Sequence, residues 1–381
     1  MLMTSAVSRT PGLLRLALPL SVLALLGIAG CGDSDSTEAS PDLPEGQVRD
    51  SAGVSILEFP ASDGRMAGPQ WDVDADLRIG VESGDPELEF GQIAGITVHP
   101  DGRIIVLDAQ ASRIRVFSPE GELVHAFGRA GQGPGELSLG AAGLFMDSEE
   151  ALLVPDMMNQ RLSRFSLDGE SLGSTPLDFT LGIPLLWMAE PDGRVLFQLR
   201  TLDMMAMTTG GGPGDVEDLI LARHPDGSGL DTLAVMPSGE TFGMGSSGIP
   251  EIRFFAPELV WTVLDGGTLV TSTNDRFSLE FRSEDGELRR IVRRPGSGPE
   301  VTEGQRRAFR DAIMDAWSEA GVPDEMMGMM SEAIGFHSHW PTLAALFPGP
   351  DGTVWIQSVD PERVLGEADQ LDFTDPAALT F

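Results

Sequence analysis

Short apolar runs alternate with turn-forming residues along most of the chain. In residues 99–123, HPDGRIIVLDAQASRIRVFSPEGEL, two runs rich in β-branched side chains lie between turns that contain Gly, Pro or Asp. Runs of this length between such turns predict β-strands. The run that follows the PDG turn is almost entirely apolar, which is typical of a strand buried on both faces.

The same pattern returns 48 residues later. Four chemically distinct positions keep this one offset: Asp108 with Asp156, Arg113 with Arg161, Phe117 with Phe165, and Gly121 with Gly169. Further copies begin at PDG-type turns, in residues 190–199, 263–294 and 349–359. A period in the forties, with four short strands in each unit, predicts an array of propeller blades.

Chain length predicts six such blades. Residues 48–381 form the predicted folded part, and a helical insertion at 302–335 interrupts it. The remainder accommodates six units of roughly 45–48 residues. We expect the sixth blade to combine the N-terminal segments GVSILEFP and QWDVDADLRIG with the C-terminal strands, because that closure leaves no open sheet edge. The predicted fold is all-β, a six-bladed propeller of four-stranded antiparallel blades with a helical hairpin near the C-terminus.

Two motifs carry a resemblance to known families. The Asp-to-Arg element of each unit resembles the NHL repeat, and FGRAGQGPGEL with the blade after it is similar to six-bladed propeller lipoproteins of bacteria. The resemblance covers about residues 48–360 and is strongest in the first two units. It implies a propeller attached to a membrane by lipid.

The N-terminus predicts an export and anchoring signal. Residues 1–30 contain arginines before a short apolar run, as in a secretory signal peptide. The run ends in Ile-Ala-Gly before Cys31, which resembles the lipobox of bacterial lipoproteins and implies that Cys31 is acylated. A plain signal peptide with an incidental cysteine is the alternative. Residues 31–47 are acidic and read as a disordered tether. Gly32 after the cysteine favours the outer membrane, by resemblance to proteobacterial sorting.

The amino-acid composition excludes several types of chemistry and of binding partner. The chain holds no Lys and carries a formal net charge of −34. Chemistry that needs a lysine is therefore excluded, including a Walker A phosphate loop or a Schiff base. We expect no nucleic acid partner, because the negative charges of the protein and of the phosphate backbone repel one another. The expected contact with a bilayer is through the acylated Cys31 only.

Two kinds of polar residue are candidate sites. Asp108 with Arg113, and Asp156 with Arg161, could bind a ligand, but a pair that recurs in successive blades is better interpreted as a structural clip. His337 and His339 stand two apart and would point the same way in an extended segment, so a divalent metal on the propeller axis is a second possibility. No other cofactor is expected.

The insertion at 302–335 has helical periodicity. Thr302 and Gln305 form a capping box, and Phe309, Ile313 and Trp317 recur at helical spacing. The second helix carries Met326, Met327 and Met330. The hairpin could simply bury its apolar side on a propeller face. Alternatively its methionines form a lid over an apolar ligand, or they bind Cu(I) together with the DMMAM segment at 203–207.

The sequence therefore predicts an extracytoplasmic, lipid-anchored propeller that acts as a binding or scaffold module for a protein, peptide or small molecule. The alternative function is a metal-assisted hydrolase or lyase of the lactonase or amidoglycolate-lyase kind, built on the propeller axis. An axial cluster of three or more His, Asp or Glu side chains would favour the enzyme.

Overall fold

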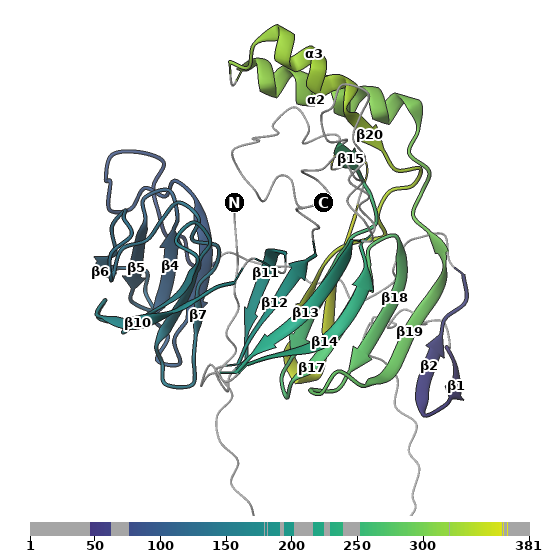
Figure 1. The fold of residues 1–381 in the computed structure, drawn as a ribbon, viewed down its shortest axis with the longest axis horizontal. Helices are drawn as coiled ribbons and strands as arrows, with labels where there is room; N and C mark the ends of the chain where they lie inside the picture. The colour runs from purple at the N-terminus through teal and green to yellow at the C-terminus, as the bar shows by residue number, and fades with distance from the viewer. Residues whose placement is uncertain are drawn as a thin grey trace, which may run out of the picture.

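Antiparallel β-sheets dominate the computed structural model (Figure 1). It describes residues 46–61, 76–178, 182–190, 194–201, 216–224, 229–238, 252–319 and 321–359, with Thr180, Pro361 and Val364. Four sheets have four consecutive strands that pair in chain order, and we call them the first to fourth blades. This meander of short strands is the blade that the repeat predicts.

The first two blades follow one another directly. The first blade contains β3 (Ile93–Val98), β4 (Ile104–Asp108), β5 (Arg113–Phe117) and β6 (Leu123–Phe127). The second blade contains β7 (Phe145–Met146), β8 (Leu152–Asp156), β9 (Arg161–Phe165) and β10 (Ser171–Pro176). Strand β4 follows a PDG turn and is buried along almost its whole length, which confirms the expectation for such strands. Strand β8, at the equivalent place in the second blade, is buried throughout.

The later copies also form blades. The third blade contains β11 (Ile183–Ala189), β12 (Val195–Arg200), β13 (Glu217–Arg223) and β14 (Leu230–Pro237). The fourth blade contains β16 (Leu259–Leu264), β17 (Thr268–Thr273), β18 (Arg276–Arg282) and β19 (Leu288–Ser297). A two-stranded sheet, β21 (Leu343–Pro348) with β22 (Val354–Ser358), forms the fifth blade.

The hydrophobic core is divided into layers between neighbouring blades. Ile105 and Ile114 of the first blade pack with Leu152 and Phe165 of the second. Equivalent clusters join the second blade to the third, the third to the fourth, and the fourth to the fifth. Each blade is therefore stabilised by burying its apolar faces against the next blade, which explains why its second strand lacks polar alternation.

The N-terminal strands do not take the place predicted for them. β1 (Gln47–Ser51) and β2 (Val54–Glu58) form a hairpin, and β2 pairs in parallel with β19 at the outer edge of the fourth blade. Arg293 of β19 reinforces the contact through an ion pair with Glu58, at 2.7 Å between nitrogen and oxygen. The expected pairing of GVSILEFP with the C-terminal strands is wrong. Parallel pairing with the exposed edge of β19 satisfies its backbone groups instead.

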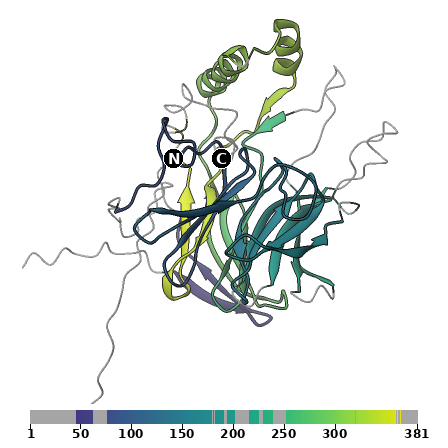
Figure 2. The same ribbon diagram turned by 90° about the vertical axis from the view of Figure 1, so that its left-hand side faces the viewer.

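The helical insertion lies where the sequence predicts it. α2 (Glu303–Glu319) and α3 (Asp324–Glu332) extend beyond the sheets in both views (Figures 1 and 2). The capping box is present, because the amide of Thr302 donates to Gln305 Oε1 and the amide of Gln305 donates to Thr302 Oγ1. Neither of these two described helices is both long and apolar enough to cross a membrane.

The insertion has a core of its own. Phe309 and Ile313 of α2 are fully buried against Phe255 and Trp340. β15 (Ile252–Phe254) and β20 (Ile334–Phe336) pair in parallel below α2 and supply further aromatic rings. The predicted apolar stripe therefore packs on a local aromatic cluster, and the blade sheets take little part in it.

Candidate functional site

A buried polar side chain ends the second strand in each of the first three blades and directly follows it in the fourth. These residues are Asp108, Asp156, Arg200 and Asn274, and all are almost inaccessible to solvent. A buried polar group needs hydrogen-bond partners to offset its lost hydration. The partners found at each position show whether it is a clip within the fold or a ligand site.

Asp108 joins three segments of the first blade. Its carboxylate accepts backbone hydrogen bonds from Gly91 and Gln92, which precede β3, and from Ala111 in the turn after β4, each at 3.1 Å. Arg115 Nη1 donates to Asp108 Oδ2 at 2.9 Å in a fully buried ion pair. Burial by itself would raise the pKa of Asp108, but these donors, Arg115 first among them, hold it below its ordinary value.

The predicted ion pair between Asp108 and Arg113 is therefore wrong. The two residues are backbone partners across β4 and β5, yet Arg113 pairs with Glu87 at 3.0 Å. Arg115 lies two residues along the same strand and so shares the face of Arg113. It reaches Asp108 diagonally and also donates to the carbonyl of Glu89 at 3.0 Å.

The second predicted pair is also replaced by other contacts. Asp156 accepts hydrogen bonds from the amide and hydroxyl of Ser138 and from the side chain of Asn159. Arg161 donates to the carbonyl oxygens of Gln132, Gly133 and Glu136, at 2.7–2.9 Å, and so holds the GQGPGE loop. Both residues act within the chain, which supports the structural interpretation of the repeat.

In the third blade, the end of the second strand carries an arginine where the first two blades have an aspartate. Arg200 ends β12, and its guanidinium binds the carboxylate of Asp218 in a bidentate ion pair, at 2.9 Å and 3.0 Å. Both side chains are buried. In the fourth blade, Asn274 Oδ1 accepts a hydrogen bond from the Glu258 amide at 2.9 Å. All four groups are therefore bonded within the chain, which supports a structural role for them.

The two candidate metal ligands lie beside the helical insertion. The ring centroids of His337 and His339 are 6.5 Å apart, and Nδ1 of His337 lies 3.3 Å from the carbonyl oxygen of His339. Within the described part of the chain, no group of three or more His, Cys, Asp or Glu side chains could hold a metal ion. A metal at His337 and His339 stays a prediction that lacks a third described ligand.

The candidate lid methionines differ in their exposure to solvent. Met327 is buried, Met326 is exposed and Met330 is intermediate between them. Cys31, the signal peptide and the 203–207 segment lie outside the described residues. The lid and the Cu(I) site therefore stay predictions.

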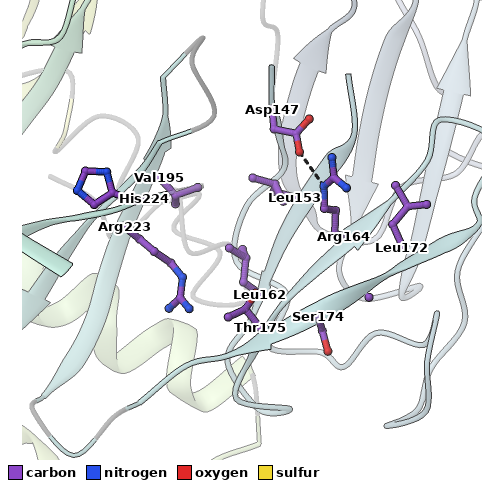
Figure 3. Close-up of a pocket in the computed structure, with 11 residues that line it drawn as sticks. Asp147, Leu153, Leu162, Arg164, Leu172, Ser174, Thr175, Val195, Arg223 and His224 are labelled. Carbon is purple, nitrogen blue, oxygen red and sulfur yellow. Dashed lines mark hydrogen bonds and ion pairs between the residues drawn. The ribbon is translucent and has the colours of Figure 1, made fainter. Parts of the chain in front are cut away.

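A cavity lies between the second and third blades, with a volume of about 290 Å³ (Figure 3). Four apolar side chains form much of its wall: Leu153, Leu162, Leu172 and Val195. Strands β8, β9 and β10 supply one side, while β12 and β13 supply the other. The hydroxyl-bearing residues Ser174 and Thr175 line the same cavity.

Two arginines enter this cavity from opposite blades, and their surroundings differ. Arg164 Nε donates to Asp147 at 2.8 Å and Nη2 donates to Glu149 at 2.6 Å, and these hydrogen bonds raise the pKa of Arg164. Arg223 extends from the third blade toward Leu162 and Thr175 (Figure 3). It has no hydrogen-bond or ion-pair partner in the described residues, and burial lowers its pKa.

Sequence reasoning did not identify either arginine. Arg164 stands 48 residues after Val116, so it places a charge where the preceding blade has a fully buried apolar side chain. Arg223 ends the apolar run LILA. A charged residue at a position that is apolar in the preceding repeat could have drawn attention to Arg164. Only the packing of the second blade against the third places both arginines at the same cavity.

Residues 84–206 match the family model DUF5128, which is described as a 6-bladed beta-propeller. The chain is a six-bladed β-propeller protein. The match extends from the segment before β3 into the third blade of the propeller. In the described residues we assign five of the blades. Among curated proteins, none matches the sequence.

Solved structures similar to the propeller come from several bacteria. A candidate exported protein of Bacteroides fragilis is 15% identical, with a TM-score of 0.40, over 67% of this chain and 65% of that one. A member of the duf4221 family from Bacteroides vulgatus is 14% identical, with a TM-score of 0.36, over 53% and 58%. Virginiamycin B lyase from Staphylococcus aureus is 12% identical, with a TM-score of 0.31, over 54% and 71%. Superpositions this partial carry no conclusion about activity.

Proposed function

We propose that this propeller is an extracytoplasmic, lipid-anchored protein that binds a small ligand between its second and third blades. The observation that carries the proposal is the cavity of about 290 Å³, which combines an apolar wall with a few polar groups from facing strands. Ligand sites in proteins are typically clefts of about 300 Å³ or more with this combination of linings. The cavity is at the small end of that range, so its ligand is small.

The buried polar groups that recur from blade to blade have structural roles, which leaves the cavity as the better candidate for ligand binding. Asp108, Asp156 and Arg200 each have partners within the chain. Arg164 and Arg223 depart from the apolar pattern and line one cavity between two blades, and of the two only Arg223 lacks a partner among the described residues. A feature that occurs once in a repeat array is available for a ligand, whereas one found in every unit serves the architecture.

The N-terminal sequence supports the lipid anchor and the extracytoplasmic location that we propose. The lipobox-like Ile-Ala-Gly-Cys31 and the apolar run before it support lipidation and export. Gly32 supports the outer membrane as the destination. A chain with a net charge of −34 is repelled by an anionic bilayer, so the acyl group supplies the attachment.

Binding can be tested with a panel of small soluble probes. Equilibrium dialysis of the full-length protein would use hexanoate, 1-hexanol, hexylamine and glucose. We expect at least one hexyl probe to bind with one-to-one stoichiometry. Ser174→Trp, which places a large side chain at an exposed position that lines the cavity, should abolish that binding.

The matched control is Ser297→Trp, at an exposed position of β19 in the fourth blade. It should bind the probe like the unaltered protein. Absence of binding by every probe, or equal binding by the two tryptophan variants, would refute this cavity as the ligand site. Stoichiometric zinc or calcium in protein purified without chelator, lost with His339→Ala, would instead favour the hydrolase or lyase.

A further inference from the structure

Arg223 gives the interblade cavity a specific chemical preference. We infer that the cavity binds a small monocarboxylate, with the carboxylate on the guanidinium of Arg223 and an apolar body against the leucine and valine side chains. This inference rests on the proposed binding function and adds the class of ligand. It begins from the difference between the two arginines that line the cavity.

Arg164 is already neutralised within the second blade. Asp147 and Glu149 both accept hydrogen bonds from its guanidinium. Arg223 faces it from the third blade and is partly buried, and no described residue accepts a hydrogen bond from it. His224, the next residue, is bound to Asp231 at 2.7 Å, so that carboxylate is engaged as well.

An unpaired guanidinium that is partly withdrawn from water favours an anion. Its planar array of donors matches a carboxylate, which can accept two parallel hydrogen bonds. Partial burial weakens competition from water and makes each charged hydrogen bond worth more than at the surface. This desolvation lowers the pKa of Arg223, and the charge of a bound anion would offset its cost.

The rest of the lining selects a single negative charge on an apolar body. One free guanidinium balances one carboxylate, whereas a phosphate dianion would bring a second charge near the carboxylate of Asp147. The buried side chains of Leu153, Leu162 and Val195 offer an apolar wall for a short hydrocarbon. Thr175 can donate its hydroxyl hydrogen to a carboxylate oxygen beside Arg223.

The experiment compares hexanoate, 1-hexanol and inorganic phosphate as probes of the full-length protein by equilibrium dialysis. We expect hexanoate to bind roughly tenfold or more tightly than 1-hexanol, the difference that one charged hydrogen-bonded contact supplies. Arg223→Met keeps the apolar stem and removes the charge. It should abolish the preference for the acid, so that hexanoate and 1-hexanol bind the variant with similar affinity.

The matched control is Arg289→Met in the fourth blade, an exposed arginine paired with Glu287. It should retain the preference. If Arg223→Met does not fold, the unaltered protein still decides the matter, because hexanoate should lose affinity as pH falls and the probe becomes neutral. Affinity for hexanoate that stays constant through that titration would refute the inference.

The two proposals fail in different ways. Equal affinity for hexanoate and 1-hexanol would leave the ligand cavity intact and overturn the assignment of a carboxylate to Arg223. Tighter binding of phosphate than of hexanoate would overturn the monocarboxylate in favour of a phosphate. No binding by any probe would refute the proposed function, and the inference with it.

Discussion

Asp108 and Arg115 form a fully buried ion pair in the first blade, with 2.9 Å between Oδ2 and Nη1. The guanidinium of Arg115 also lies 4.8 Å from the ring centroid of Phe90. Both charges are withdrawn from water, so each depends on the other for compensation. Arg113, directly opposite Asp108 in the sheet, forms a partly exposed pair with Glu87 instead.

This arrangement predicts unequal couplings for the two arginines. Asp108→Ala leaves the buried Arg115 without a counter-charge, so it should lower the free energy of unfolding by about 3–5 kcal/mol. Adding Arg115→Met should restore part of that loss. Arg113→Ala removes a partly exposed ion pair and should cost roughly 0–1 kcal/mol.

Urea unfolding of the single and double variants measures these couplings as two mutant cycles. The cycle of Asp108 with Arg113 should show little coupling and serves as the control. Stronger coupling of Asp108 to Arg113 than to Arg115 would contradict the geometry.

Stability should depend on the protonation of Asp108 at low pH. Its pKa is lower in the folded protein than in the unfolded chain, where an aspartate titrates at about 3.9. Asp108 therefore contributes its full stabilisation above that value, and this is lost as pH falls through the lower folded pKa. Asp101 behaves likewise, because hydrogen bonding, first from the Arg103 amide, lowers its pKa to about 2.

The measurement is the difference in unfolding free energy between the unaltered protein and Asp108→Asn, which cancels most of the effect of net charge. We expect this difference to be constant above about pH 5 and to shrink below about pH 4. A difference that grows as the solution is acidified would show that Asp108 is not ionised in the folded protein.

The helical insertion should depend strongly on one ring. Phe309 is 1% exposed and contacts Phe254 and Phe255 in edge-to-face geometry. Phe309→Ala should cost about 3–5 kcal/mol through lost burial and the cavity left behind. Phe347→Ala, at a position 47% exposed, is the control and should cost about 0.5 kcal/mol or less. Denaturant titration would compare them, and equal losses would refute the buried role of Phe309.

The proposed lipid anchor can be tested at Cys31. Cys31 is the only cysteine, so its thiol is the only acceptor for the proposed acyl group. Cys31→Ser should abolish labelling by a fatty-acid analogue and leave the melting temperature of the propeller unchanged. Undiminished labelling of the variant would disprove lipidation at this residue.

Local patterns were enough to predict the strands, the turns and the helical hairpin. A run such as IIVLD between a PDG turn and a second turn strongly favours a β-strand over other secondary structures. Thr302 and Gln305 mark the start of α2, because the capping contacts join residues only three positions apart. The offset of 48 made the blade visible as a unit, because each blade meets the same packing demand. The sequence therefore determined the repeat, the fold class and the place of the insertion.

Tertiary structure decided which polar groups meet. Arg113 and Arg115 share one face of β5, and only the course of the Glu87 and Glu89 segment assigns the first to Glu87 and the second to Asp108. The N-terminal hairpin pairs with β19. The sequence could not predict this partner, because any open strand edge offers the same backbone groups. Arg164 and Arg223 are 59 residues apart and line one cavity only because adjacent blades pack face to face. Side-chain pairing between blades depends on distances that no local sequence pattern encodes.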